Sequence, residues 1–401
     1  MKKFLLIAAA GMALTASAQN VTENKLSFSY TQLPLMPLDE STTVYNIAVE
    51  RHFEKANEDS LVAYQARLEA AQMKYEAELT AWETKRDVIL KDYYTKMSTW
   101  QKAVNAGQAS QKPVDPIIPE RPVMDEVLEP QLHSDIEDSK VDAFFNLQGY
   151  DKGEGGAKIT VTINPIANVV YGSKTTGSAA TTKYQYFVQY KMPVNISVED
   201  PSKGTVWQTI LYNNVRTYNI NTYTSQYDHD LWLIDNKETF WAKFESDVRN
   251  ITLKDVNKQL NDNCGFPVYN HSTEIYTVKK HKDHQYNDLV NAYTAAMQGY
   301  QLIAQELDHS AAEPKLREAI KIWEAALTES QVNNNKARIN DKVTALLYCN
   351  IANAQIWLNE YSAAEANLNL AISVNVNKFK RIANGLKGTS ERNKKRFNAN
   401  K

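Results

Sequence analysis

The sequence predicts a multi-domain α+β protein, in which an antiparallel β domain carries an inserted stalk and is followed by a helical module. Three observations predict this class. Strand-like alternation occurs on both sides of a long stretch that lacks it, that stretch joins a helical apolar stripe to a proline repeat, and the last part of the chain has helical spacing. We expect a β-rich domain of residues 19–54 and 140–280, a stalk of residues 55–139, a helical module of residues 281–377 and a basic tail of residues 378–401.

The N-terminus has the order of a secretory signal. Met1-Lys2-Lys3 precedes an apolar stretch from Phe4 to Leu14, and Ala16-Ser17-Ala18 follows, so we expect residues 1–18 to be removed on export. The apolar stretch is too short to span a bilayer, and no later run reaches the roughly 18 apolar residues of a membrane helix. We therefore expect an exported chain in the periplasm or at the outer membrane or cell surface, with no transmembrane segment in the mature chain.

Strand signals frame the stalk. Residues 25–30 and 45–49 alternate apolar and polar side chains, and the alternation returns from residue 158 to about 220. A turn at residues 200–204 joins two strands as a hairpin, which favours an antiparallel sheet or sandwich. Residues 172–182 are of low complexity and are expected to form a mobile loop. If the early strands pair with the later ones, the stalk is presented from a rigid base.

The stalk begins as a helix. Residues 57–104 contain no proline or glycine, and apolar residues recur there at helical spacing. The opposite face is filled with good helix formers, so one helix of roughly 70 Å is expected. The apolar stripe includes the aromatic residues Tyr75, Trp82, Tyr93 and Trp100.

A proline repeat follows the helix at a period of three, with Pro113, Pro116, Pro119 and Pro122. Polyproline II has three residues per turn, so these rings share one face. At about 3.1 Å per residue, residues 109–134 could retrace roughly 80 Å. We expect a turn near residues 105–107 to reverse the chain and the prolines to pack on the aromatic stripe.

This architecture resembles the fibrillar stalks of streptococcal surface adhesins, in which a helix rich in Tyr, Ala, Glu and Lys pairs with a proline repeat. The similar segment of sequence is Tyr75-Glu76-Ala77-Glu78-Leu79-Thr80-Ala81-Trp82-Glu83. The resemblance covers about 80 residues and implies the architecture only. Two other interpretations stay open: a self-associating coiled coil, and a helix lying on its own β domain beside a disordered proline loop.

Helical spacing returns from Tyr286 onward. Six residues fall at the spacing of packing residues in tetratricopeptide repeats: Tyr348, Ile351, Ala352, Ala364, Leu368 and Ala371. This segment resembles a tetratricopeptide module, which implies helix pairs whose concave groove binds segments of other proteins. It departs from the family at Val376, where the usual proline is absent. A partial earlier match lies 45 rather than about 34 residues upstream.

The charge is unevenly placed along the chain. Residues 378–401 contain nine Lys or Arg and one acid, Glu391. A disordered, solvated tail and attraction to an anionic lipid or glycan surface, or to an acidic partner, both fit this pattern. Nucleic acid is not an expected partner of an exported chain. Cys264 and Cys349 could form one bridge or remain two isolated buried thiols.

No catalytic, cofactor or metal site is predicted. His281, Asp283 and His284 lack third and fourth ligands at recognisable spacing, and the glycines of residues 153–156 indicate a loop rather than a phosphate cradle. No pair of carboxylates is singled out for glycoside hydrolysis. Ser60, within Asp59-Ser60-Leu61, fits a short pattern that resembles the O-glycosylation signal of exported Bacteroidota proteins.

The first functional hypothesis is a non-enzymatic, exported envelope scaffold that binds other envelope proteins, at the outer membrane or in the periplasm. It rests on two elongated modules joined to one sheet domain. The alternative is a glycan-binding or adhesive surface protein, in which the aromatic sheet of residues 184–215 stacks on sugar rings.

Overall fold

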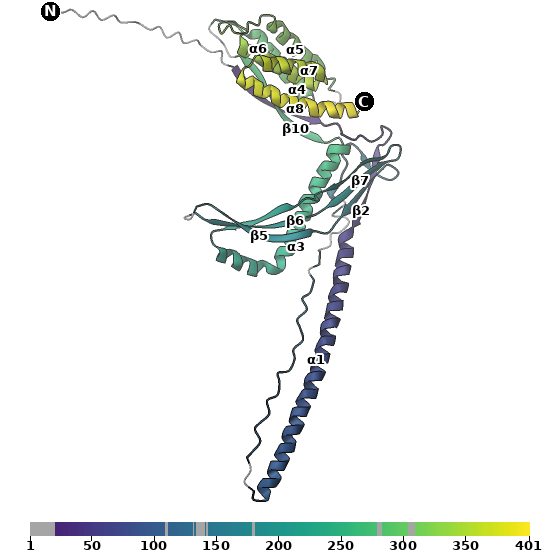
Figure 1. Ribbon diagram of the computed structural model, residues 1–401. Coiled ribbons are helices and arrows are strands. Elements are labelled where there is room, and N and C mark those ends of the chain that lie inside the picture. The colour runs from purple at the N-terminus through teal and green to yellow at the C-terminus, as the bar shows by residue number, and fades with distance from the viewer. Residues whose placement is uncertain are drawn as a thin grey trace, which may run out of the picture.

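The computed structural model describes residues 21–108, 111–130, 132–133, 141, 143–178, 181–278, 283–303 and 309–401. The expected signal, residues 1–18, lies outside this range. The predicted α+β class with antiparallel sheets is confirmed, together with a helical C-terminal region. Figure 1 shows the helical region at one end, two sheets with a long helix in the middle, and a single helix with an extended segment beside it at the other end.

The middle of the molecule contains two sheets. A five-stranded sheet has the order β3-β2-β4-β7-β8, in which β2 runs parallel to β3 and β4 while β4, β7 and β8 are antiparallel. A three-stranded antiparallel sheet has the order β5-β6-β9. The strand bounds are β2 Val44–Arg51, β3 Asp151–Lys152, β4 Ala157–Ile163, β5 Ala167–Thr176, β6 Lys183–Lys191, β7 Val194–Asp200, β8 Gly204–Leu211 and β9 Arg216–Tyr223.

The predicted turn at residues 200–204 joins β7 and β8 as a hairpin. The buried Asp200 carboxylate closes it by accepting hydrogen bonds from the N–H groups of Ser202 and Lys203 and, across the chain, from Asp39 N–H and the Thr42 hydroxyl, at 2.8–3.0 Å. Burial acts to raise the pKa of Asp200, but these four donors hold it below its ordinary value.

The predicted loop at residues 172–182 is wrong in its first half. Residues 172–176 belong to β5, which pairs with β6 through Gly172 opposite Phe187. Glycine is needed there because an added Cβ would lie 2.7 Å from the Phe187 ring. The low complexity of this stretch hid a strand whose side chains are mostly exposed.

A 39-residue helix, α3 (Gln226–Cys264), packs against these sheets and was not predicted from the sequence. Its buried face repeats at intervals of three and four residues and shares one hydrophobic cluster with both sheets. The apolar residues on that face are Phe240, Phe244, Val248, Leu253, Val256, Leu260 and Cys264.

The structure groups the outer strands differently from the prediction. β1 (Val21–Thr31) and β10 (Val268–Val278) form their own two-stranded antiparallel ribbon. Leu26 and Phe28 of β1 and Ile275 of β10 are buried in the core of the helical region, not with the other strands. Residues 19–54 and 140–280 therefore contribute to two cores, because pairing of β1 with β10 carries both strands to the helices.

The helical region comprises α4 (Asn287–Leu302), α5 (Glu313–Leu327), α6 (Asp341–Trp357), α7 (Tyr361–Ser373) and α8 (Asn377–Ala399). α4 packs on α5, α6 packs on α7, and α8 packs on both α6 and α7. α4 and α5 come close at Gly299, where an added Cβ would lie 2.8 Å from the Leu316 side chain.

A disordered C-terminal tail is contradicted by the structure, because residues 377–399 form helix α8. Phe379 and Ala383 on its inner face are fully buried, and Phe397 packs against the same core. Apolar residues at helical spacing therefore fix a segment whose charge alone suggested disorder.

The two cysteines remain separate buried thiols. Cys264 belongs to the core of the sheets and Cys349 to the core of the helices. Burial raises the pKa of each thiol to about 12. Among the described residues, no helix is long and apolar enough to cross a membrane.

Candidate interaction surfaces

The stalk, residues 52–133, starts with helix α1 (His52–Asn105), whose 54 residues span about 81 Å. β2 ends at Arg51 and α1 begins at the next residue, so no linker separates the sheet from the helix. The helix ends at the predicted turn, where Gly107 has φ of 71° and its N–H bonds to Val104 O at 3.0 Å. A left-handed residue at this point reverses the chain.

The return segment lies along α1 and bonds to it in several places (Figure 1). Trp82 Nε1 donates to Pro119 O at 2.7 Å, and the Tyr93 hydroxyl donates to Asp115 Oδ1 at 2.7 Å. Further along, Lys74 Nζ pairs with Asp125 Oδ2 at 2.7 Å. These bonds tie the return segment to the aromatic stripe of the helix.

The predicted packing residues all lie on the contact side of the stalk. The helix residues Tyr75, Trp82, Tyr93 and Trp100 are half-buried, and so are Pro113, Pro116, Pro119 and Pro122, while the residues between those prolines are exposed. A burial period of three is that of polyproline II.

The spacing of the cross-contacts supports the same conformation. Asn57 and Tyr93 are 36 positions apart on α1, about 54 Å, and their partners His133 and Asp115 are 18 positions apart on the return segment. The return segment therefore rises about 3.0 Å per residue, close to the 3.1 Å of polyproline II.

The base of the stalk is fastened to the sheet domain. The Asn57 side chain donates to His133 O at 2.9 Å and accepts from His133 N–H at 2.8 Å, while His133 Nδ1 lies 2.9 Å from Glu245 Oε1 of α3. Phe53, in the first turn of α1, is buried beneath the guanidinium of Arg249, 5.1 Å from its ring centroid. Both arms are thus held where they leave the sheets.

One side of the return segment is an apolar ridge, defined here as Val114, Ile117 and Val123. These residues follow Pro113, Pro116 and Pro122, whereas the exposed Glu120 follows Pro119 and stands between Ile117 and Val123. The exposed fractions of the three apolar side chains are 84%, 92% and 84%. Large apolar side chains in a row at such exposure mark interaction surfaces more often than isolated ones do. Nothing in the described part of the chain covers the ridge.

Ser60 lies near the base of α1, where its hydroxyl donates to Ala56 O at 2.8 Å. It is half-buried and helical rather than in a loop.

The predicted repeat residues lie at the packing surface of α6 and α7. Five of them are buried, namely Ile351, Ala352, Ala364, Leu368 and Ala371, while Tyr348 is partly buried against the same core. They serve packing, which agrees with their expected role, and the tetratricopeptide resemblance itself stays a prediction.

The β1–β10 ribbon covers α4 and α6. Asn350 of α6, which is 2% exposed, accepts from Tyr276 N–H at 3.1 Å and donates to Tyr276 O at 2.7 Å. One turn further, Asn353 donates to the Thr273 hydroxyl at 2.7 Å. The helices hold an extended strand of their own chain, so this face is not open to a segment of another protein.

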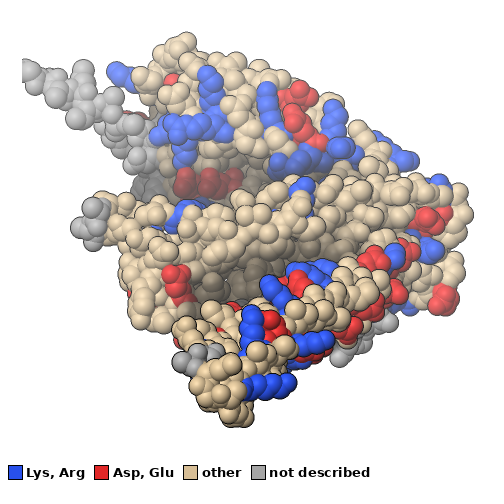
Figure 2. Space-filling view, turned by 60° about the horizontal axis from the view of Figure 1, so that its bottom comes forward, with Lys and Arg blue, Asp and Glu red and all other residues tan. Residues whose placement is uncertain are grey.

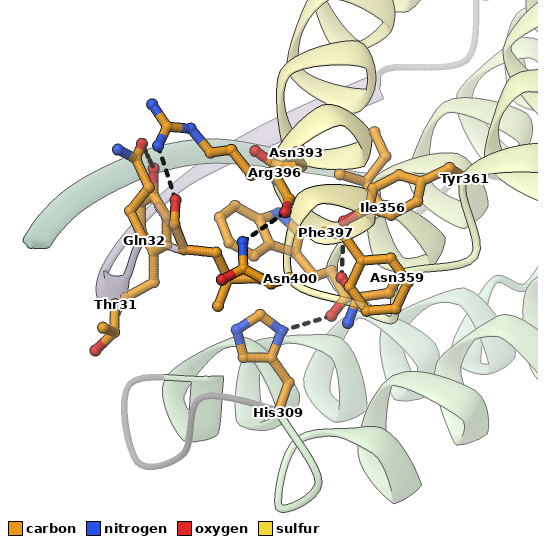
Figure 3. A pocket seen from close by; sticks show the side chains of 13 residues that line it. Thr31, Gln32, His309, Ile356, Asn359, Tyr361, Asn393, Arg396, Phe397 and Asn400 are labelled. Carbon is orange, nitrogen blue, oxygen red and sulfur yellow. Dashed lines mark hydrogen bonds between the residues drawn. The ribbon is translucent and has the colours of Figure 1, made fainter. Parts of the chain in front are cut away.

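A cavity of about 240 Å³ lies between the end of β1, the end of α6 and the end of α8 (Figure 3). His309, at its edge, contacts Trp357 O through Nδ1 at 2.8 Å, and Asn400 donates to Arg396 O at 2.7 Å. Among the described residues of its lining there is no Asp or Glu. It combines aromatic rings with side-chain amides: Tyr30, Trp357, Tyr361 and Phe397 with Gln32, Asn359, Asn393 and Asn400.

Arg396 is the charged residue at this cavity, and it holds two chain segments together. Its Nη1 donates to Leu33 O and to Asp262 O, each at 2.7 Å. Burial lowers the pKa of Arg396, while the nearby Asp262 acts in the opposite direction. This contact is structural and joins α8 to the junction between α3 and the ribbon.

The structure also places the aromatic sheet of the glycan-binding alternative and His284, for which no metal site was predicted. The aromatic sheet proposed for sugar stacking has Tyr186 and Tyr190 buried in its core, so these rings are closed to a ligand. His284 contacts Lys336 O through Nε2 at 2.8 Å, and its predicted neighbour His281 lies outside the described residues. Within the described ranges, no three His, Cys, Asp or Glu side chains gather as a metal site.

Comparison with protein-family models, with curated proteins and with solved structures found no match to this chain. The functional argument therefore rests on the geometry described above.

Proposed function

We propose that the chain is an exported, non-enzymatic scaffold of the bacterial envelope, which uses its stalk to reach and bind another envelope protein. The observation that carries this proposal is the stalk itself. An arm of about 81 Å leaves the sheet without a linker and is braced along its length by a return segment. Beyond Phe53 at its base, the helix of this arm buries no residue in the domain that bears it, which supports a role in spacing or contact.

The contact surface that we assign to the stalk is the apolar ridge of Val114, Ile117 and Val123. The helical region offers less open surface than its resemblance implied, because the ribbon already covers α4 and α6. Buried apolar area is the main source of binding energy between proteins. The ridge therefore supports binding to an apolar groove of a partner.

The test places a photo-activated cross-linker at Ile117 in cells, with the same group at the exposed residue Thr205 of β8 as control. We expect one envelope protein to cross-link at Ile117 and to be lost when Val114 and Val123 are changed to Ser. Cross-links from both positions to the same mixture of proteins, or from neither position, would contradict the scaffold proposal.

A second candidate function is glycan binding, and the cavity in Figure 3 favours it. Sugars are commonly bound by aromatic faces together with amide donors and acceptors, and both are present among the described residues that line this cavity. Asn393→Phe would fill the cavity, while Asn398→Phe on the exposed side of α8 is the matched control. Glycan binding predicts that Asn393→Phe alone abolishes retention on insoluble envelope glycan.

A further inference from the structure

The outer face of α8 carries a cluster of cations, defined here as the α8 basic face: Lys380, Arg381, Lys387, Arg392, Lys394 and Lys395. All are exposed except Lys387, which is half-buried and donates to the Asn369 amide at 2.7 Å. Figure 2 shows Lys and Arg gathered over the helical region, with few acidic residues among them. Within the described part of the chain, the one ion pair of α8 is Lys378 with Glu23, which lies outside this set.

Several helical lysines elsewhere pair with acids one turn away, namely Lys96 with Asp92, Lys243 with Asp247 and Lys258 with Asp262. On α8 only Glu391 is available for six cations. Like charges one turn apart destabilise a helix slightly. The α8 basic face therefore departs from the pattern that the rest of the chain uses for stability.

The first turn of α8 also carries charge of the sign that the helix dipole disfavours. It contains Lys378 and Lys380 and no acid, although the N-terminal end of a helix dipole favours negative charge. The other long helices follow the dipole, with Glu54 at the start of α1, Asp228 at the start of α3 and Asp341 at the start of α6. The ion pair with Glu23 accounts for Lys378, whereas helix stability does not account for Lys380 at this end of α8.

The inner face of α8 is fixed in the protein core by Phe379 and Ala383. The helix cannot turn its apolar side outward to insert into a bilayer, so any binding by the outer face is electrostatic. Four of the six cations are lysines, which act as point charges on a diffuse anionic field, whereas specific phosphate pockets favour the arginine fork. The exposed face of one helix also offers no groove to enclose a polymer chain.

We propose that the α8 basic face binds the surface of an anionic lipid membrane through headgroup phosphates. The helical region lies at the opposite end of the molecule from the stalk (Figure 1). The lipid contact and the tip of the stalk therefore lie at different ends of the molecule (Figure 1). This inference is independent of which protein the apolar ridge contacts.

The test measures co-sedimentation of the mature chain with phosphatidylcholine vesicles that contain or lack phosphatidylglycerol. The variant changes Lys380, Arg381, Lys394 and Lys395 to Gln. The control removes the same charges from exposed positions of α1, with Arg67, Lys85, Lys91 and Lys102 changed to Gln. Circular dichroism checks that both variants keep their helices.

Each cation near an anionic bilayer strengthens binding roughly fivefold. With four cations removed, we expect the α8 variant to lose on the order of 600-fold in affinity. The control should bind as the parent does, and added salt should weaken all binding. Equal binding to vesicles without phosphatidylglycerol, or equal loss in both variants, would overturn the proposal. So would binding to a soluble anionic polysaccharide with none to vesicles, which would assign the face to a polymer.

Discussion

Asn350 provides a direct test of how the ribbon is held on the helices. Its amide satisfies both backbone groups of Tyr276 in a site that excludes water. In Asn350→Leu, a side chain of similar volume replaces the amide and leaves an N–H and a C=O unpaired. Buried unpaired groups of this kind destabilise by about 1–3 kcal/mol each. Allowing for relaxation of the strand, we expect a loss of about 2–4 kcal/mol in the free energy of opening the ribbon.

Hydrogen exchange followed by mass spectrometry measures the free energy of opening the ribbon, peptide by peptide. For residues 268–278 of β10, the expected loss corresponds to exchange roughly 30- to 700-fold faster in the variant. Peptides from β4 and β7 in the other core should be unchanged, since their hydrophobic cluster is separate. Asn367→Leu is the control, because this residue on α7 bonds only within the helices and not to the ribbon.

Unchanged exchange in β10 of Asn350→Leu would refute the reasoning, because it would mean that the two bonds do not hold the strand in solution. Equal acceleration in β4 and β7 would refute it differently, by showing that the two cores open together.

Three further predictions concern the stalk, a turn and a helix contact. Trp82→Ala removes a bond and a ring from the stalk contact, so endoproteinase Glu-C should cut faster after the exposed Glu120, while Met73→Ala on the exposed side of α1 should leave this rate unchanged. Asp200→Asn should lower the free energy of unfolding at pH 7 by about 1.5–3 kcal/mol, measured by urea denaturation. Because the folded pKa of Asp200 is depressed, its contribution is fully present above the unfolded pKa of about 3.9 and is lost as the pH falls through the folded pKa, so parent and variant should converge at pH values below the folded pKa. Gly299→Ala should destabilise the helical region by about 1–3 kcal/mol in thermal unfolding, because its Cβ meets an α5 side chain.

The stalk was predictable because both of its arms carry their own periodicity. The helix repeats its aromatic residues at helical spacing, the return segment repeats proline every three residues, and the two lengths match. The observed α1 begins five residues before and ends one residue after the predicted residues 57–104, and only the difference at its end is within the usual one or two residues. What joins the arms, such as Trp82 donating to Pro119 O, depends on register and could not be predicted from either pattern alone.

The ribbon and the long helix of the sheet domain show two different limits. β1 and β10 pair over some 240 residues of sequence, and alternation in each strand says nothing about its partner. By contrast, Phe240, Phe244 and Val248 of α3 do repeat at four-residue spacing. That spacing lies in a segment rich in Asp and Asn, which are weak helix formers. Counting the intervals between its apolar residues would have predicted the helix.

The basic C-terminal segment shows how composition can conceal a fold. Its nine cations suggested solvation, yet Phe379, Ile382, Ala383 and Leu386 mark one face of a helix. The candidate cavity of Figure 3 could not be predicted at all, because its lining comes from β1, α6 and α8 together.

The pairing of a helix with a polyproline II segment also limits how the length of the stalk can change. Seven added residues lengthen α1 by two turns, about 10.5 Å, and keep its aromatic stripe on the same side. Three added residues lengthen the return segment by about 9.3 Å and keep its prolines on the same side. Insertions in one arm alone would leave the other too short or bulged out. Stalks of this type are therefore expected to differ in length between related chains in steps of about 10 Å, each step adding seven residues to the helix and three to the return segment.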